Sequence, residues 1–148
     1  MQNELFRIAK SILDRGFLMS LGTQDSGGIW VSDIVYVNDN GLNLYWISEE
    51  ASRHSTAILY NKEVAATITI TDAPGQPLEG LQISGQAYKI EGEVRPITAK
   101  YADKQKMQAP SGRDGILAPG QSWYYLKPSK VEIIYEKLFG TAKQSFGT

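Results

Sequence analysis

The first sixteen residues have the apolar spacing of an amphipathic helix. Apolar side chains recur every three or four positions and charged side chains occupy the remaining face; the apolar positions are Leu5, Ile8, Ala9, Ile12 and Leu13. This spacing follows the 3.6-residue turn of an α-helix. Asn3 is suited to cap the start of the helix and Gly16 to follow its end. The pattern therefore predicts a helix over residues 1–16 that packs against the rest of the chain.

Beyond Gly16 the hydrophobic period falls to two, which is typical of half-buried strands. An Asn-Gly pair at residues 40–41 favours a tight hairpin between two of them. Short helices are expected between strands, one starting near Ser52 and one over residues 98–108. The predicted strands cover residues 17–23, 29–37, 42–48, 64–71, 81–90 and a bent pair at 122–126 and 130–135.

Six strands joined mostly by hairpins favour an antiparallel β-barrel, because closing a sheet removes the edges that would otherwise need protection. A parallel sheet of βαβ units fits the pattern less well. The predicted fold class is therefore mainly β (α+β), a six-stranded antiparallel barrel with an N-terminal helix and short inserted helices.

Composition narrows the possible functions. The chain has 148 residues, which indicates one domain, and its 15 basic and 16 acidic residues leave no excess of positive charge for binding nucleic acid. It has no cysteine, which excludes disulfides, iron–sulfur clusters and thiolate nucleophiles, and one histidine, which excludes a metal site with two imidazoles in one chain. The start resembles no signal peptide, and no stretch approaches the ~18 apolar residues of a membrane span, so we expect a cytoplasmic protein with no membrane partner.

Motifs for common chemistries are missing as well. The sequence contains no dinucleotide-binding, P-loop or nucleophile-elbow pattern. With no cysteine and one histidine, an enzyme of this composition would obtain its reactive atoms from a bound cofactor. We therefore assign no catalytic residue and no metal ligand, and a Ser-His-Asp hydrolase built on His54 is disfavoured.

The most informative local cluster is Ser52-Arg53-His54, which follows a predicted strand and opens a predicted helix. A helix N-terminus favours a phosphate, and a guanidinium adds a bidentate donor. The alternative is that Ser52 is only a helix cap and Arg53 a solvated charge, which is the commoner situation for such residues. A second row, Gln82, Ser84 and Gln86, shares one face of a strand and contacts either the polar edge of a ring system or water.

Three segments in order resemble the pyridoxamine 5′-phosphate oxidase-like family of FMN-binding split barrels, and within it the general-stress-protein-like branch. They are residues 44–68 (LYWISEEASRHSTAILYNKEVAATI), 80–90 (GLQISGQAYKI) and 123–135 (WYYLKPSKVEIIY). The resemblance implies a single split-barrel domain over 1–148, with the helix at 1–16, the barrel at 17–135 and a tail at 136–148. It also implies a homodimer whose FMN lies in a cleft between the subunits.

The resemblance also suggests which residues contact the cofactor. Ser52, Arg53 and His54 match the triplet that grips the FMN phosphate, Ile47 and Ser48 match the strand end along the flavin, and Gln82 lies near a glutamine position on a later strand. The implied function is an FMN-dependent oxidoreductase acting on an unidentified small molecule. The alternative is a non-catalytic protein that binds haem, another flavin-like ring or a phosphorylated metabolite.

Two departures from the family pattern bear on the substrate. Pyridoxamine phosphate oxidases carry an arginine and a lysine in the second strand, whereas residues 31–36 (VSDIVY) contain no basic residue. The C-terminal segment offers Lys143 but no arginine. We therefore expect a substrate other than pyridoxamine phosphate.

Overall fold

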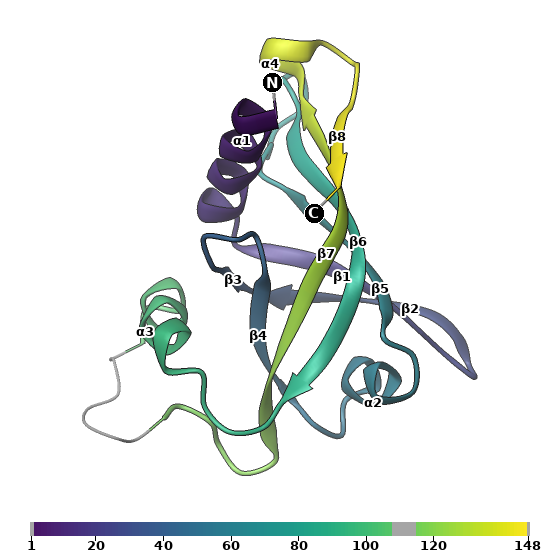
Figure 1. Cartoon of the computed structure of the whole chain (residues 1–148), viewed down its shortest axis with the longest axis vertical. Coiled ribbons are helices and arrows are strands. Elements are labelled where there is room, and N and C mark those ends of the chain that lie inside the picture. Colours follow the sequence, from purple (N-terminus) through teal and green to yellow (C-terminus); the bar gives the residue numbers. More distant parts are fainter. Residues whose placement is uncertain (1, 108–114, 148) are drawn as a thin grey trace.

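The computed structural model describes residues 2–107 and 115–147 of the chain as a curled antiparallel sheet with four helices around it (Figure 1). The elements in chain order are α1 (Gln2–Arg15), β1 (Leu18–Asp25), β2 (Gly28–Val35), β3 (Val37–Asn38), β4 (Leu44–Glu49), α2 (Arg53–Tyr60), β5 (Glu63–Thr69), β6 (Glu79–Ile90), α3 (Arg95–Lys104), β7 (Gln121–Tyr135), α4 (Glu136–Phe139) and β8 (Gln144–Gly147).

All strand pairs in the sheet are antiparallel, and the strand order is β2-β1-β5-β6-β7-β4-β3, with β8 paired to β7. The two strands at the ends of this order, β2 and β3, are consecutive in the chain and are separated by Tyr36 alone. The sheet therefore curls until its two edges meet at Tyr36. This curled antiparallel half-barrel agrees with the barrel architecture that the hairpins predict.

The prediction of six strands is wrong, because the described part of the chain has eight. Residues 34–37 (IVYV) are all apolar and contain no turn signal, yet the predicted strand divides into β2 and β3 at Tyr36. The Tyr36 side chain is fully buried, and its hydroxyl donates a 2.7 Å hydrogen bond to the Leu13 carbonyl of α1. The second added strand, β8, lies in the predicted tail and places Phe146 opposite Val131 of β7.

The bent sixth strand is the continuous β7, which pairs with β6 along most of its length. The register of that pair shifts between Ser84 and Gly85. A Cβ at Gly85 would lie 2.2 Å from the Lys127 carbonyl oxygen, and only glycine permits this approach of two backbones.

The N-terminal helix forms as predicted, but its two ends are built differently from the expectation. The helix begins at Gln2, so Asn3 lies inside it and is not its cap. Gly16 is required for space and not for a left-handed backbone: a Cβ there would lie 2.3 Å from the Tyr36 hydroxyl and 2.7 Å from Ile68 Cγ2. Glycine thus lets α1 approach the sheet at the place where β2 and β3 meet.

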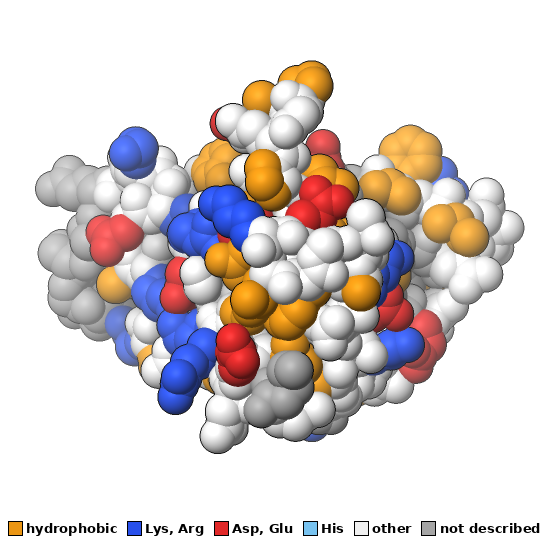
Figure 2. All heavy atoms as spheres, turned by 90° about the horizontal axis from the view of Figure 1, so that it is seen from above, with side chains coloured by type: hydrophobic (Ala, Val, Ile, Leu, Met, Phe, Trp, Pro, Cys, Tyr) orange, Lys and Arg blue, Asp and Glu red, His pale blue; other side chains and the backbone are white. Residues whose placement is uncertain are grey.

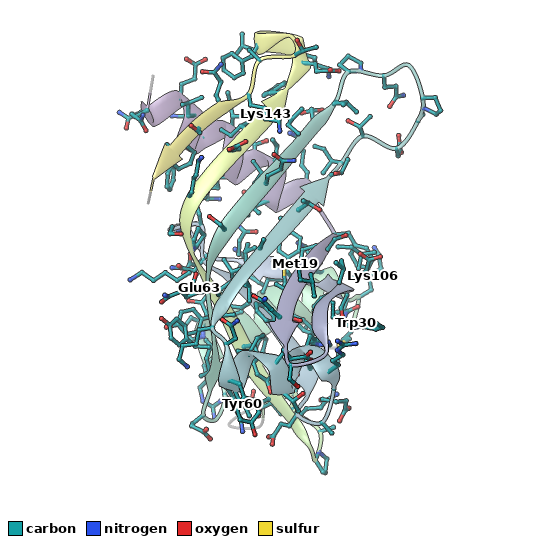
Figure 3. All side chains as sticks on the ribbon, turned by 90° about the vertical axis from the view of Figure 1, so that its right-hand side faces the viewer. Met19, Trp30, Tyr60, Glu63, Lys106 and Lys143 are labelled. Carbon is teal, nitrogen blue, oxygen red and sulfur yellow. The ribbon has the colours of Figure 1, made fainter. Side chains whose placement is uncertain are left out.

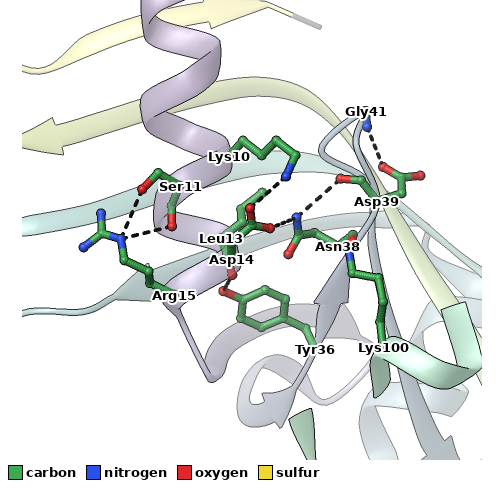
Figure 4. A network of polar contacts seen from close by, with 10 residues as sticks. All are labelled: Lys10, Ser11, Leu13, Asp14, Arg15, Tyr36, Asn38, Asp39, Gly41 and Lys100. Atoms are coloured by element: carbon green, nitrogen blue, oxygen red, sulfur yellow. Dashed lines mark hydrogen bonds and ion pairs between the residues drawn. The ribbon is translucent and has the colours of Figure 1, made fainter. Parts of the chain in front are cut away.

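Polar contacts fix the C-terminal half of α1 to the sheet (Figure 4). Asp14 accepts hydrogen bonds from Lys10 at 2.7 Å and from the buried Asn38 at 2.8 Å. Burial acts to raise the pKa of Asp14, but the hydrogen bonds from Lys10 and Asn38 outweigh it and leave that pKa lowered. Arg15 reaches Glu79 of β6 at 3.0 Å. The helix is therefore held by both its apolar face and its charged end.

Apolar side chains gather in two clusters. The larger lies between α1 and the concave face of the sheet and includes Leu13, Trp46 and Phe146. The smaller lies on the outer face of β4 and β7, where Ile97 and Tyr101 of α3 cover other apolar side chains. The helix predicted at 98–108 therefore begins earlier, at Arg95, and carries a buried face; Gln108 lies outside the described residues.

Basic and acidic side chains are intermixed on the face seen in Figure 2, in keeping with the near-neutral net charge. No helix within the described ranges is long and apolar enough to cross a membrane.

Candidate ligand site at the start of α2

The turn after β4 opens α2 with a serine cap, as the sequence predicts. Ser52 has extended backbone angles (φ −66°, ψ 154°), and its side chain accepts a hydrogen bond from the Ser55 amide. Ala57 and Ile58 are buried beneath the helix and fix its orientation, whereas Tyr60 is 87% exposed. The amides of a first helical turn lack partners within the helix and carry positive potential, so this end of α2 attracts an anion.

Arg53 does not extend into bulk solvent but turns toward the β1–β2 hairpin. Its Nε lies 3.0 Å from Asp25 Oδ2 and its Nη2 lies 3.1 Å from Asp25 Oδ1. The guanidinium also lies 4.5 Å from the centre of the Trp30 ring. The hydrogen bond from Arg53 lowers the pKa of Asp25, and the same contact raises the pKa of Arg53, so both groups are charged at neutral pH.

A hollow of about 900 Å³ lies between this hairpin and the outer face of α2. Its volume is that of a site for a cofactor-sized molecule. Its lining combines one cation and one anion with neutral amides and hydroxyls; the described lining residues are Gln24, Asp25, Ser26, Gly27, Arg53, Thr56, Ala57, Tyr60 and Asn61. Figure 3 shows Trp30 and Tyr60 on the same lower part of the molecule.

Ser48, Ser52 and His54 also come together, in a cluster separate from the Arg53 guanidinium. The His54 Nε2 atom lies 2.9 Å from Ser48 Oγ and 3.3 Å from Ser52 Oγ. Burial lowers the pKa of His54, so its imidazole is neutral at pH 7. None of these three side chains is among the described residues that line the hollow. They form a hydroxyl–imidazole cluster at the junction of β4 and α2.

The structure places Ile47 and Gln82 in other surroundings. Ile47 packs with the apolar cluster that α3 covers. Gln82 lies on β6 and accepts a 3.0 Å hydrogen bond from Lys143. Figure 3 shows Lys143 at the end of the molecule opposite to Tyr60 of α2. The described lining of the hollow thus includes neither residue, and their assignment to a cofactor stays a prediction.

Two residues of this region have no counterpart in the sequence-based prediction. Asp25 lies between the predicted strands at 17–23 and 29–37, and Trp30 lies within the second of them with no role assigned to it. Arg53 and Asp25 are 28 positions apart. No local pattern connects residues at that distance, so the pair emerges only when the sheet folds.

Some known proteins resemble this chain in sequence or in structure. No family model matches the chain. A UPF0306 protein from Photorhabdus laumondii is 28% identical over 100 residues, which cover 66% of this chain and 70% of that protein. A putative pyridoxamine 5′-phosphate oxidase from Listeria innocua superimposes with a TM-score of 0.70 at 21% identity, covering 88% of this chain and 98% of the other. General Stress Protein 26 from Bacillus anthracis superimposes with a TM-score of 0.69 at 13% identity, covering 97% of this chain and 99% of the other. 

A heme binding protein from Mycobacterium smegmatis superimposes with a TM-score of 0.68 at 17% identity, covering 96% of this chain and 57% of the other.

Two further structural neighbours carry a cofactor in their names. An F420 reductase superimposes with a TM-score of 0.62 at 19% identity, covering 82% of this chain and 94% of the other. An FAD-binding protein from Mesorhizobium loti gives 0.61 at 13% identity, covering 83% of this chain and 88% of the other. Likeness at such low identity is a statement about fold. The resemblance found in the sequence is thereby confirmed at that level: the chain has the split-barrel fold of the pyridoxamine 5′-phosphate oxidase-like proteins.

Proposed function

We propose that this protein is an FMN-binding flavoprotein, a cytoplasmic oxidoreductase that acts on an unidentified small molecule. The observation that carries the proposal is the position of Arg53, whose guanidinium is fixed at the start of α2 on the hollow of about 900 Å³. Several neighbours of that fold are named for flavin-type cofactors, which supports a flavin over an unrelated phosphate compound.

The residues around the hollow suit a phosphorylated cofactor in most respects. Arg53 and the first turn of α2 supply donors for a phosphate, and Thr56 and Tyr60 add hydroxyl groups along the wall. Asp25 opposes the phosphate, because its carboxylate already occupies the Arg53 donors. When bound, the flavin supplies the hydride or electron transfer. The chain binds and orients it, and the Ser48–His54 contact fixes the hydroxyl that the resemblance places along the ring.

We also propose the homodimer that the resemblance implies, with the cofactor cleft at the subunit interface. Three consecutive residues of β2 support it: Ile29 is 76% exposed, Trp30 46% and Val31 61%. A run of exposed apolar side chains on an edge strand is costly in water and is usually covered by a partner. This run continues directly from the hairpin that carries Asp25, so a second subunit seated there would border the hollow.

The proposal is tested by titrating purified protein with FMN and following the quenching of flavin fluorescence. We expect saturable binding that weakens in Arg53→Gln and is unchanged in Arg7→Gln, a matched control on the exposed face of α1. A dissociation constant above about 100 μM for the wild type, which is weaker than about −5.5 kcal/mol, would reject FMN as a dedicated cofactor.

A second candidate is haem binding without turnover. It is supported by the heme binding protein among the structural neighbours and by His54, a half-buried neutral imidazole suited to an axial ligand. Its Nε2 would first have to leave Ser48. Titration with haemin should then shift the Soret band in the wild type and not in His54→Ala. An identical spectrum for both proteins would exclude ligation by His54.

A further inference from the structure

The β1–β2 hairpin holds a carboxylate on the donors that an anionic ligand group would use. Asp25 engages Arg53 through both of its oxygens, at 3.0 Å to Nε and 3.1 Å to Nη2. The planar fork of a guanidinium matches a carboxylate and a phosphate equally well. The two anions therefore compete for the same pair of N–H groups.

The hairpin itself fixes this carboxylate. Asp25 Oδ1 also accepts a 2.8 Å hydrogen bond from the Gly27 amide, which closes the turn. The turn lies close to the arginine, since a Cβ at Gly27 would be 3.0 Å from Arg53 Nη2. Trp30, on the strand that leaves the hairpin, stacks on the same guanidinium. Asp25 is thus held against Arg53 by its own turn and by the neighbouring ring.

We propose that Asp25 is a specificity-determining residue of this site, whose carboxylate competes with the ligand phosphate for Arg53 and so weakens the preference for a phosphorylated ligand over its dephosphorylated form. This inference rests on the proposed function. It predicts that the phosphate contributes less to FMN binding than it would if Arg53 had no carboxylate partner. The neutral groups of the hollow then supply most of the affinity.

The test compares FMN with riboflavin, which lacks the phosphate. Both are titrated against the wild type, Asp25→Asn and Asp25→Ser at one fixed ionic strength. Both substitutions remove the charge and retain a side-chain oxygen that can accept the Gly27 hydrogen bond. We expect FMN to bind about fivefold more tightly to either variant, as fits the modest strength of a partly exposed ion pair, while riboflavin binding stays unchanged.

A matched control removes one negative charge elsewhere. Asp72→Asn lies in the exposed β5–β6 loop and should leave the ratio of riboflavin to FMN dissociation constants at its wild-type value. Arg53→Gln should bring that ratio close to one. An unchanged ratio in both Asp25 variants would overturn the inference, and a lower ratio would show instead that Asp25 positions Arg53 for the phosphate.

Failure of the proposed function has a different signature. If the wild type and all variants bind neither flavin, the flavoprotein proposal fails. Competition at Arg53 is then read directly by titrating inorganic phosphate and following the Arg53 Nε–H resonance by NMR. A larger response in Asp25→Asn than in the wild type would still support the competition, and equal responses would reject it.

Discussion

Two regions of this molecule hold their charged and polar side chains in opposite ways. At the base of α1, Tyr36 and Asn38 are almost fully buried and are hydrogen-bonded to the helix. At the start of α2, Arg53 and Asp25 keep 36% and 23% of their side chains exposed and lie on a hollow. The first arrangement costs stability when it is broken, whereas the second leaves its charges accessible to a ligand. The comparison separates groups that build the fold from groups that are available for binding.

The largest effect should come from filling the space at the base of α1. Gly16→Ala would place a methyl group 2.3 Å from the Tyr36 hydroxyl, and overpacking of this kind should cost about 3 kcal/mol of the free energy of unfolding. Urea denaturation measures this loss. Gly41→Ala, where the nearest atom is 3.5 Å away, is the matched control and should change little. Equal stability of both variants would contradict the close approach of α1 to the sheet.

A smaller loss is expected from Tyr36→Phe. The substitution keeps the ring and removes the donor to the buried Leu13 carbonyl, which should cost about 1.5 kcal/mol in urea denaturation. Tyr60→Phe, at an 87% exposed position on α2, should have no measurable effect. If the two variants were equally stable, the hydroxyl of Tyr36 would not anchor the helix.

The same region should respond to pH through Lys104. Its ammonium lies 4.0 Å from the centre of the Tyr36 ring, and its Nζ has no hydrogen-bond partner among the described residues. Burial lowers its pKa to about 8, while Asp14 acts to raise it and Lys100 to lower it. Between pH 8 and about 10 the unfolded chain therefore binds more protons, and the free energy of unfolding should rise with pH.

Lys104→Met isolates this contribution, because the other titrating groups cancel in the difference from the wild type. The stability of the wild type relative to Lys104→Met should rise by about 1 kcal/mol from pH 7.5 to 9.5, a modest value because the side chain is only half-buried. Measurements stop below pH 10, since burial raises the pKa of Tyr36 and its unfolded form ionises there. A difference that is constant with pH would contradict the burial of this amine.

The smallest effect on stability should come from the ligand site. Asp25→Asn breaks a partly exposed ion pair and keeps an acceptor for the hairpin turn, so its urea midpoint should match that of the wild type. Its effect appears in ligand binding instead. A large loss of stability in this variant would remove the distinction between the two regions.

The local pattern of residues was sufficient to predict those elements whose structure depends on their own residues. The spacing of Leu5 to Leu13 predicts α1, and Ser52 correctly marks the start of α2. The division of a strand at Tyr36 was missed because residues 34–37 are all apolar and contain no turn signal, and the reason for the break is a contact with α1. β8 contains a single buried apolar residue, Phe146, which is too few to show a period.

The candidate site could be predicted only in part for the same reason. The sequence indicates an arginine at a helix start, which depends on neighbouring residues alone. The carboxylate that meets it comes from a hairpin whose position depends on the pairing of β1 with β2 and β5. Gln82 could be placed on a strand face, but its contact with Lys143 depends on how the tail returns to the sheet.

The meeting of both sheet edges at Tyr36 has a consequence for how the molecule unfolds. A single residue joins the first and last strands of the sheet and also bonds to the N-terminal helix, so the seam of the barrel and the docking surface of the helix are the same place. Detaching the helix exposes that seam, and opening the seam withdraws the anchor of the helix. Helix and barrel therefore belong to one cooperative unit, and hydrogen exchange should protect the amides of α1 and β3 to the same extent.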